Sequence, residues 1–426
     1  MNNGFILEIP LQAEYVVQTL RDNGYEAYVV GGCVRDQLLQ DSPQDWDVTT
    51  SADPDGIKRC FSGYRTIETG ISHGTVGLFV DGMYIEVTSY RIDGVYSDNR
   101  RPDSVIFTGS LTEDLGRRDF TVNAMAYNRD KGLIDPFDGL SDIKASVVRS
   151  VNCAYERFNE DALRILRGLR FASQLSFLIE EKTSEAILGS TGLLKNLSAE
   201  RIAKELEGII TGYSAKQILL EYKEVFLAVI PELSHLYSNG SLLAETLDTI
   251  MLLPPDPCMR YAVLLKAAAE AGEINKTGTS AVEGAEKTLK RLKYSRDTVS
   301  VITAMIQHLD SDIVPEKQSL KRSMNLLGPD CLKKMIQIKK ARSYLLLREA
   351  NEDCDRAIAL IDGIISDGEC YSLKQLAVNG DDLITEGIPP GERLGNTLSF
   401  LLEGVIAGRW DNTKEVLLDQ TKQREE

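Results

Sequence analysis

The sequence lacks any apolar run long enough to cross a membrane, and it contains very little histidine. No stretch of about 18 consecutive apolar residues occurs in the chain, so a membrane-spanning helix is not expected. The N-terminal segment does not place an apolar stretch after a basic one, as a secretory signal would. Three histidines are too few for a histidine-rich metal centre. We therefore expect a cytoplasmic protein with no membrane partner.

The seven cysteines stand apart in the sequence, and no two of them form a C-x-x-C pair. Structural zinc sites usually take ligands from such closely spaced pairs, so no zinc site is expected. An odd number of cysteines cannot all be joined in disulfides within one chain. The pattern is typical of reduced thiols in a cytoplasmic protein.

Acidic residues predominate, and the net charge of −16 argues against a nucleic-acid partner when it is taken over the whole chain. The segment 91–170 is different, because its 13 Lys and Arg residues balance its 13 Asp and Glu residues. Eleven of those cations are arginine, whose forked guanidinium suits phosphate and base contacts. A local surface for nucleic acid is therefore compatible with an acidic chain.

The hydrophobic pattern changes near residue 150. Before it, short β-rich runs such as 25–30 and 45–50, and a hairpin over 74–91, indicate a mixed sheet with a few helices. After it, apolar residues recur at helical spacing up to the C-terminus. The sequence thus predicts an α+β protein in which a sheet domain precedes a long helical region.

A glycine pair and two carboxylates lie close together near the N-terminus. Gly31-Gly32 permits close approach of the backbone to a ligand, and the helix expected after it offers N–H groups to an anion. Arg35 adds a fork for phosphate. Asp45 and Asp47 are two residues apart on a predicted strand and should point to the same side. Together these residues predict a site for a metal ion and a triphosphate, although Asp-x-Asp alone is more often a solvated strand face.

These motifs resemble those of the tRNA nucleotidyltransferases and bacterial poly(A) polymerases, the class II branch of the nucleotidyltransferase superfamily. The resemblance rests on GGCVRD (31–36), DWDVTT (45–50), RRDFTVNA (117–124), DPFDG (135–139) and EDALR (160–164). It implies a nucleotidyltransferase head with a mixed β-sheet, followed by an all-α neck, body and tail. We expect these parts at 1–150, 151–215, 216–375 and 376–426.

The resemblance also implies roles for individual residues. Asp45 and Asp47 are expected to bind the metal ions, which we take to be Mg²⁺, and Glu86 is expected to be the third catalytic carboxylate. The other residues expected to bind the nucleotide are Gly32, Arg35, Arg118, Asp119, Asp161, Arg164, Arg167 and Arg170. DPFDG is expected to have only a structural role. Residues 90–107 are similar to the family's flexible loop.

Asp161 and Arg164 are predicted to read the incoming base. Cytosine and adenine present an amine donor beside a ring-nitrogen acceptor, whereas uracil and guanine present a carbonyl beside an N–H. A carboxylate accepts from the amine and an arginine donates to the ring nitrogen, so the pair would select C and A. Asp161, Arg164, Arg167 and Arg170 recur at every third position and are expected on one helix. Taken alone, this spacing is better explained by an amphipathic helix with salt bridges.

As a whole, the resemblance implies a CCA-adding enzyme. Such an enzyme adds C, C and A to the tRNA 3′ end from CTP and ATP without a template, by two-metal nucleotidyl transfer that releases pyrophosphate. The expected partners are the tRNA 3′ end, ATP and CTP, and neither DNA nor a membrane. An A-adding tRNA nucleotidyltransferase has nearly the same motifs and remains the first alternative.

Two further functions fit the sequence less well. A poly(A) polymerase is disfavoured because 64–79 lacks that group's G-R-[RK]-F string. A catalytically inactive RNA-binding protein is disfavoured because Asp45, Asp47 and Glu86 are all present.

Overall fold

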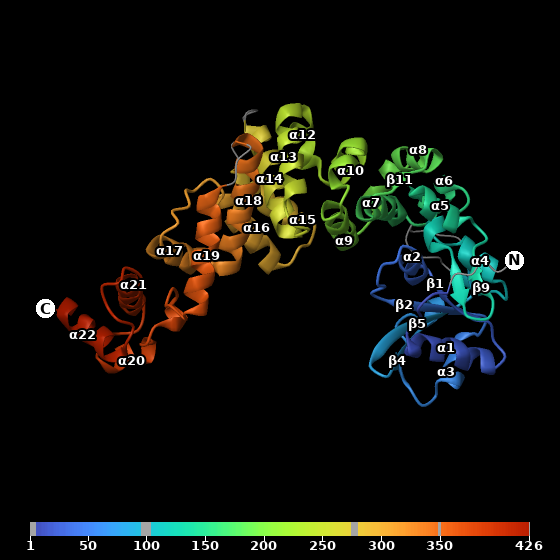
Figure 1. Ribbon diagram of the computed structural model, residues 1–426, viewed down its shortest axis with the longest axis horizontal. Helices are drawn as coiled ribbons and strands as arrows, with labels where there is room; N and C mark the ends of the chain where they lie inside the picture. The colour runs from blue at the N-terminus through green and yellow to red at the C-terminus, as the bar shows by residue number, and fades with distance from the viewer. Residues whose placement is uncertain (1–5, 95–103, 274–279, 348–350, 426) are drawn as a thin grey trace. The chain divides into compact units, whose positions relative to one another are not determined.

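The chain divides into two compact units, Met1–Pro231 and Glu232–Glu426. The computed structural model describes residues 6–94, 104–273, 280–347 and 351–425. The first unit carries the β-sheet, and the second is built from helices (Figure 1). Within the described ranges, no helix is both long enough and apolar enough to span a bilayer. These observations confirm the predicted α+β architecture, while the four-part division of the chain stays a prediction.

A seven-stranded mixed sheet forms the centre of the first unit, in the order β3-β4-β5-β2-β1-β8-β9. Its strands are β1 Ala27–Val30, β2 Trp46–Thr50, β3 Arg65–Ile67, β4 Thr75–Val80, β5 Met83–Ser89, β8 Ala126–Asn128 and β9 Gly132–Ile134. Of these pairings, β2 with β5 is parallel and the others are antiparallel. In β5, Ile85 and Val87 are buried while Glu86 is exposed, as the two-residue period of a strand requires. This alternation places Glu86 on the open face of the sheet.

The helices of the head are α1 Leu11–Asp22, α2 Gly32–Leu38, α3 Pro54–Cys60, α4 Leu111–Gly116 and α5 Gly139–Ala145. α1 and α3 lie together along one face of the sheet (Figure 1). The four apolar residues that predicted α1 from their spacing, Ala13, Val16, Val17 and Leu20, are all buried. Asp135 accepts hydrogen bonds from the backbone N–H groups of Gly139 and Leu140, both at 2.8 Å, so DPFDG caps α5 as a structural motif.

Two short strand pairs lie outside the main sheet. The antiparallel pair is β6 Arg91–Asp93 with β7 Val105–Phe107, and the parallel pair is β10 Val147–Val148 with β11 Leu178–Ile179. The first pair lies within the loop predicted at 90–107, of which residues 95–103 are outside the described residues. The second pair joins segments on both sides of the predicted boundary at residue 150.

The rest of the first unit is helical. Its helices are α6 Ala154–Glu160, α7 Leu163–Leu175, α8 Glu181–Gly189, α9 Ala199–Ile210, α10 Ala215–Glu221 and α11 Lys223–Val229. α9 buries Ile202, Leu206 and Ile209 along one side and packs against α7. This contact fixes the position of α7, the helix that carries the predicted nucleotide-binding arginines.

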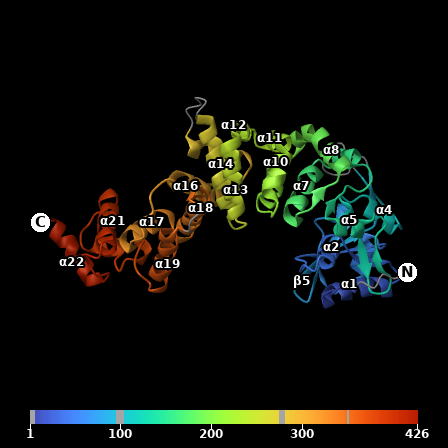
Figure 2. The same ribbon diagram turned by 45° about the horizontal axis from the view of Figure 1, so that its top comes forward.

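Among the described residues, the second unit begins with eight helices, of which α14 is the central one. They are α12 Ser234–Ser238, α13 Gly240–Leu252, α14 Pro257–Glu273, α15 Ala281–Arg291, α16 Arg296–His308, α17 Lys317–Leu327, α18 Pro329–Leu347 and α19 Glu352–Ser366. α14 packs against α12, α13, α15, α16 and α18, and Figure 2 shows it beside α13. Its run of alanine and leucine is buried on several sides, as expected for a central helix.

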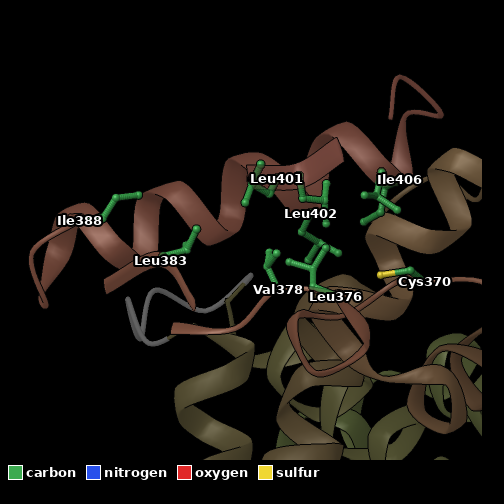
Figure 3. Close-up of a cluster of buried hydrophobic side chains, with 10 residues drawn as sticks. Cys370, Leu376, Val378, Leu383, Ile388, Leu401, Leu402 and Ile406 are labelled. Atoms are coloured by element: carbon green, nitrogen blue, oxygen red, sulfur yellow. The ribbon is translucent and has the colours of Figure 1, made fainter. Parts of the chain in front are cut away.

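The C-terminal helices have their own apolar core. They are α20 Gly380–Thr385, α21 Glu392–Ile406 and α22 Lys414–Glu425. Figure 3 shows the cluster that joins them, which includes Leu383, Leu401 and Leu402 and extends back to Cys370. This apolar core includes Cys370 as well as Leu376, and the tail boundary at residue 376 stays a prediction.

Gly404→Ala is expected to destabilise this tail core. A Cβ atom at position 404 would lie 1.9 Å from Trp410 Cε3, so the indole ring must move, at a cost of about 1–3 kcal/mol. Denaturant unfolding followed by tryptophan fluorescence measures the loss. Gly363→Ala is the control, because a Cβ in the middle of α19 meets nothing within 4 Å. Equal unfolding midpoints for the two variants would contradict this account of the tail.

Candidate active site

The turn after β1 brings the backbone close to a partly buried arginine. β1 ends at Val30, Gly31 has a φ of +84°, and α2 begins at Gly32. A Cβ atom on Gly31 would lie 2.9 Å from Arg118 Nη1, whereas one on Gly32 would meet its nearest neighbour at 3.8 Å. The left-handed backbone and the close contact both require glycine at position 31. Gly32, the glycine predicted to bind the nucleotide, lies in the first turn of α2 next to it.

Gly31→Ala is expected to weaken CTP binding and to lower the melting temperature. Alanine is strained by about 1–3 kcal/mol in the backbone conformation of Gly31, with φ +84° and ψ −130°, and its methyl group would also displace Arg118. Gly82→Ala is a matched control, because Gly82 has a φ of +82° but a Cβ there meets nothing within 4 Å. Calorimetric CTP binding and thermal unfolding should show that Gly82→Ala loses stability alone. CTP affinity that falls equally in both variants would count against a role for the contact with Arg118.

The carboxylates gather where the parallel pairing of β2 with β5 begins. Asp47 on β2 and Glu86 on β5 are direct neighbours in the register. Asp45 precedes β2, which begins at Trp46, so the prediction that both aspartates lie on the strand is wrong for Asp45. Burial raises the pKa of Asp47 to about 6; Arg118 opposes the rise, and Glu86 and Asp45 add to it. The ionised form of Asp47 is thus unfavourable here unless a cation lies nearby.

These carboxylates fit a metal ion that is shared with a substrate. Among the residues that the structure describes, no three His, Cys, Asp or Glu side chains form a cluster that could hold a metal. Mg²⁺ in phosphate-transfer sites is usually bound by only one or two carboxylates, because substrate phosphates and water complete its shell. Asp45 and Asp47 can supply those ligands, and a divalent ion would offset the repulsion from Glu86 and Asp45 that adds to the effect of burial on the pKa of Asp47.

A tyrosine orients Glu86. The hydroxyl of Tyr84 donates to Glu86 Oε1 at 3.2 Å. Its ring lies over Gly77 of β4, where a Cβ atom would be 2.5 Å from the tyrosine oxygen. Gly77 is itself the register partner of Glu86. A glycine within β4 thus makes room for the residue that holds the carboxylate.

The segment RRDFTVNA (117–124) takes part in a largely buried network of charges. The side chain of Arg118 lies 3.8 Å from Asp114, and its Nε atom is buried with no hydrogen-bond partner within the described ranges. Asp119 accepts hydrogen bonds from Asn123 Nδ2 at 3.2 Å and from Arg167 Nε at 2.7 Å. Burial alone would raise the pKa of Asp119, but Arg167 and its other partners lower that pKa to about 2. Asp119 is therefore a carboxylate that accepts hydrogen bonds at any working pH.

Arg35 connects this network to α2. Its Nε and Nη2 atoms donate to Asp36 Oδ1 at 2.9 and 2.6 Å, and its Nη1 donates to Asn123 Oδ1 at 2.7 Å. The guanidinium also lies over the ring of Phe171, 5.1 Å from its centroid. Three of its five N–H groups are thus engaged by protein groups. The contact of Arg35 with phosphate stays a prediction, and it would use the two N–H groups that remain.

The predicted base-reading pair lies at the junction of α6 and α7. Asp161 follows the end of α6 with φ −133° and ψ 103°, and α7 begins at Leu163. The prediction of one helix is therefore wrong for Asp161, although Arg164, Arg167 and Arg170 are on α7. The backbone N–H of Leu163 donates to Asp161 Oδ1 at 3.1 Å, so this carboxylate caps the first turn of α7.

The three arginines on α7 have different partners. Arg164 donates through Nη1 to Glu160 Oε2 at 2.7 Å and through Nη2 to the carbonyl oxygen of Arg117 at 2.9 Å. Arg167 pairs with Asp119, as described above. Arg170 donates to Glu205 Oε2 of α9 at 2.6 Å, so in this structure it joins two helices. Its predicted nucleotide contact stays a prediction.

A cavity of about 390 Å³ brings residues of the sheet and of the α6–α7 junction together. Glu86 and Tyr84 from β5 and Asp161 and Arg164 from the α6–α7 junction all line it. Its volume is within the range of about 300–1,000 Å³ that is typical of small-molecule sites. Asp45 and Asp47 are not among its lining residues, but Asp47 is the strand neighbour of Glu86. The cavity can therefore hold a nucleotide whose base lies beside Asp161 and Arg164 and whose phosphates point toward the carboxylates.

Sequence reasoning missed three residues that support this site: Tyr84, Asp114 and Arg201. Asp114 is fully buried and accepts from Arg117 Nε at 2.9 Å. Its spacing of four from Arg118 is a helical pair that the sequence alone could have suggested. Arg201 Nη2 donates to both carboxylate oxygens of Asp161, at 3.1 and 2.8 Å, and no sequence signal connects these two positions.

Proteins of known family match this chain along nearly its whole length. A CCA-adding enzyme of Lactobacillus delbrueckii subsp. bulgaricus is 33% identical to it, over 98% of this chain and 99% of the relative. A CCA-adding enzyme of Levilactobacillus brevis is 36% identical, over 95% and 96% of the two chains. The chain belongs to the family of CCA-adding enzymes. This result confirms the predicted resemblance and makes the chain a nucleotidyltransferase.

Domain models agree with this family assignment. The model described as "Poly A polymerase head domain" matches residues 27–149, which contain the entire seven-stranded sheet. Two further models match the helical part: "Probable RNA and SrmB- binding site of polymerase A" at 176–236 and "tRNA nucleotidyltransferase domain 2" at 277–421. The carboxylates on β2 and β5 and the segment RRDFTVNA (117–124) thus lie within the head domain of the family.

Solved structures of CCA-adding enzymes share the fold. The Bacillus stearothermophilus CCA-adding enzyme in complex with CTP is 29% identical, covers 97% of this chain and 98% of its own, and has a TM-score of 0.77. The Thermotoga maritima CCA-adding enzyme complexed with tRNA is 20% identical, with a TM-score of 0.54 over 96% and 94% of the two chains. At that identity, the second likeness shows the fold alone.

Proposed function

We propose that this protein adds C, C and A to the 3′ end of tRNA from CTP and ATP without a nucleic-acid template. The observation that carries the proposal is the cavity that Glu86 of the head shares with Asp161 and Arg164 of the neck. A catalytic carboxylate and a donor–acceptor pair suited to C and A open into one space. Each addition joins the tRNA 3′ oxygen to the α-phosphate of the nucleotide, and pyrophosphate leaves.

The family generally uses divalent metal ions, and we propose Mg²⁺ for this chain. Asp45 and Asp47 would hold it together with substrate phosphates, and Glu86 would contribute from β5. When bound, Mg²⁺ would lower the pKa of the attacking hydroxyl and offset the charge of the leaving pyrophosphate. Burial is the main cause of the raised pKa of Asp47, and a bound cation would stabilise the ionised carboxylate against both this burial and the repulsion from Glu86 and Asp45.

The nucleotide would be held by groups that the structure leaves able to bind it. Arg118 has a buried Nε donor that lacks a partner in the described part of the chain, and a phosphate oxygen would satisfy it. Asp119 would accept from a ribose hydroxyl, while Arg167 holds its carboxylate in place. Gly32 and Arg35 would contribute through the first turn of α2. Asp161 would accept from the exocyclic amine, and Arg164 would donate to the ring nitrogen.

An A-adding enzyme is the alternative that the motifs leave open. Incubation of the protein with single nucleotides and with tRNA that lacks A, CA or CCA separates the two functions. A CCA-adding enzyme extends tRNA lacking CCA by two residues with CTP alone, and it extends tRNA lacking only A with ATP. An enzyme that extends only the second substrate is A-adding, and the proposal for C addition then fails.

We also place the protein in the cytoplasm. Cys33, Cys331, Cys354 and Cys370 are buried free thiols, as expected for a chain that folds in a reducing compartment. Maturation of tRNA 3′ ends requires ATP and CTP, which is consistent with the same compartment.

A further inference from the structure

Arg201 of α9 holds the carboxylate of Asp161 in a two-point contact. Its Nη2 atom donates to Oδ1 at 3.1 Å and to Oδ2 at 2.8 Å. The backbone N–H of Leu163 donates to Oδ1 at 3.1 Å. A carboxylate offers about four acceptor positions, two on each oxygen, so these contacts occupy three. One acceptor position remains, and it is on Oδ2.

We propose that Arg201 is a positioning residue that sets nucleotide selectivity by aiming this remaining acceptor of Asp161 at the exocyclic amine of cytosine or adenine. The inference rests on the proposed function, in which Asp161 and Arg164 read the base. Asp161 lines the cavity together with Arg164, and the side chains of Arg201 and Asp161 are only 22% and 19% exposed. At such low exposure, a charge-assisted contact strongly restricts the direction of the carboxylate.

The position of Arg201 is itself fixed by α9. Ile202 and Leu206 on this helix are buried, and α9 packs against α7. Four residues after Arg201, on the same side of α9, Glu205 accepts from Arg170 of α7 at 2.6 Å. α9 is therefore anchored both to the segment before α7 and to α7 itself. Arg201 can act as a fixed reference for the Asp161 side chain.

Asp161 needs such a reference because its backbone is not part of a helix. Its φ of −133° and ψ of 103° place it in the extended link between α6 and α7. Its backbone N–H donates to Arg157 and its carbonyl accepts from Arg164, and the backbone N–H of Leu163 holds the side chain at Oδ1. Without Arg201, Oδ2 would lose its hydrogen bond and could turn toward Arg164, which lines the same cavity. The two side chains would then satisfy each other instead of the base.

Packing alone does not account for an arginine at this position. The Nη1 atom of Arg201 is buried and has no hydrogen-bond partner in the described part of the chain, which is unfavourable for a donor. An apolar side chain would fill the same space without leaving a donor unsatisfied. The contact with Asp161 is what an apolar side chain could not supply.

The test measures nucleotide selectivity and stability together. Single-turnover incorporation of CTP, ATP, UTP and GTP is measured separately, on tRNA lacking CCA and on tRNA lacking only A. The variants are Arg201→Met, which keeps most of the side-chain volume, and Arg201→Lys, which keeps a donor to the carboxylate. Lys204→Gln is the control, because it removes one cation from an exposed position on the same helix. Thermal unfolding of each variant is recorded in parallel.

We expect Arg201→Met to lower the preference for CTP over UTP about tenfold, on the scale of one charge-assisted hydrogen bond. The change should come from slower use of CTP and ATP, with UTP and GTP little affected. Arg201→Lys should restore part of the preference, and Lys204→Gln should keep all of it. In an Asp161→Ala background, Arg201→Met should have no further effect on preference, because Arg201 acts through Asp161.

Three results would overturn the inference. Arg201→Met could slow the incorporation of all four nucleotides by the same factor, which is the result expected if Arg201 has only a structural role. Its effect on preference could persist in the Asp161→Ala background. Arg201→Met could also fail to fold. In that case, an Arg201→Lys variant that loses stability but keeps the wild-type preference for CTP over UTP would overturn the inference. A wild-type protein that does not prefer CTP and ATP would instead refute the proposed function, and this outcome is visible before any variant is made.

Discussion

Asp47→Ala is expected to abolish nucleotide incorporation while leaving the protein at least as stable as the wild type. Asp47 is the half-buried carboxylate at the start of β2, beside Glu86 and close to Asp45. If it binds the metal ion, its loss removes stabilisation of charge in the transition state, and the rate should fall by at least about 1,000-fold. The fold should not suffer, because the substitution also removes a carboxylate that its neighbours repel.

The matched control for this substitution is Asp41→Ala. Asp41 is an exposed acid in the segment before β2, so its loss changes the net charge equally without altering the carboxylate group. Incorporation of CTP into tRNA lacking CCA is measured for both variants in Mg²⁺, with thermal unfolding as the test of folding. Near-normal turnover by Asp47→Ala would show that the metal assignment is wrong. A large loss of activity in Asp41→Ala would show that net charge, rather than the metal site, controls the rate.

Asp161→Asn is expected to make UTP a measurable substrate and to weaken the use of CTP and ATP by about 10- to 100-fold, from about 1–3 kcal/mol per lost contact. The amide presents both a donor and an acceptor where the carboxylate presented acceptors only. Uracil could then place its carbonyl against the amide N–H, a contact that the carboxylate cannot make. Asp45, Asp47 and Glu86 are unchanged, so the metal site should remain intact.

Single-turnover incorporation of all four nucleotides measures this change of preference. Glu156→Gln, a substitution of an exposed carboxylate on α6, makes the same chemical change outside the cavity and should leave the preference as it is. An unchanged preference in Asp161→Asn would mean that this residue does not read the base. The arginines of α7 would then be explained by their ion pairs with Asp119, Glu160 and Glu205 alone.

The sequence predicted the sheet and its carboxylates because local rules determine them. Alternation of buried and exposed residues identified β5 and placed Glu86 on its open face. The glycine pair identified the turn before α2, although the structure shows that Gly31, with its positive φ, is the position that requires glycine. These features depend on residues that are neighbours in the chain.

The arrangement of Asp161 could not be predicted in the same way. The three-residue spacing from Asp161 to Arg170 fits one continuous helix, and neither proline nor glycine marks the break between α6 and α7. Arg201 is 40 residues away from Asp161, and only the packing of α9 against α7 brings them together. Contacts of this kind depend on tertiary structure, and no local pattern reports them.

The most direct test of the central claim is the sequence of the product. The wild-type protein is incubated with tRNA lacking CCA, Mg²⁺ and all four nucleotides at equal concentrations, and the tRNA 3′ ends are then sequenced. The account predicts that most extended molecules end in CCA and carry no further residues. Frequent incorporation of U or G would contradict base reading by Asp161 and Arg164. A long A tail, or no extension of this substrate, would contradict CCA addition itself.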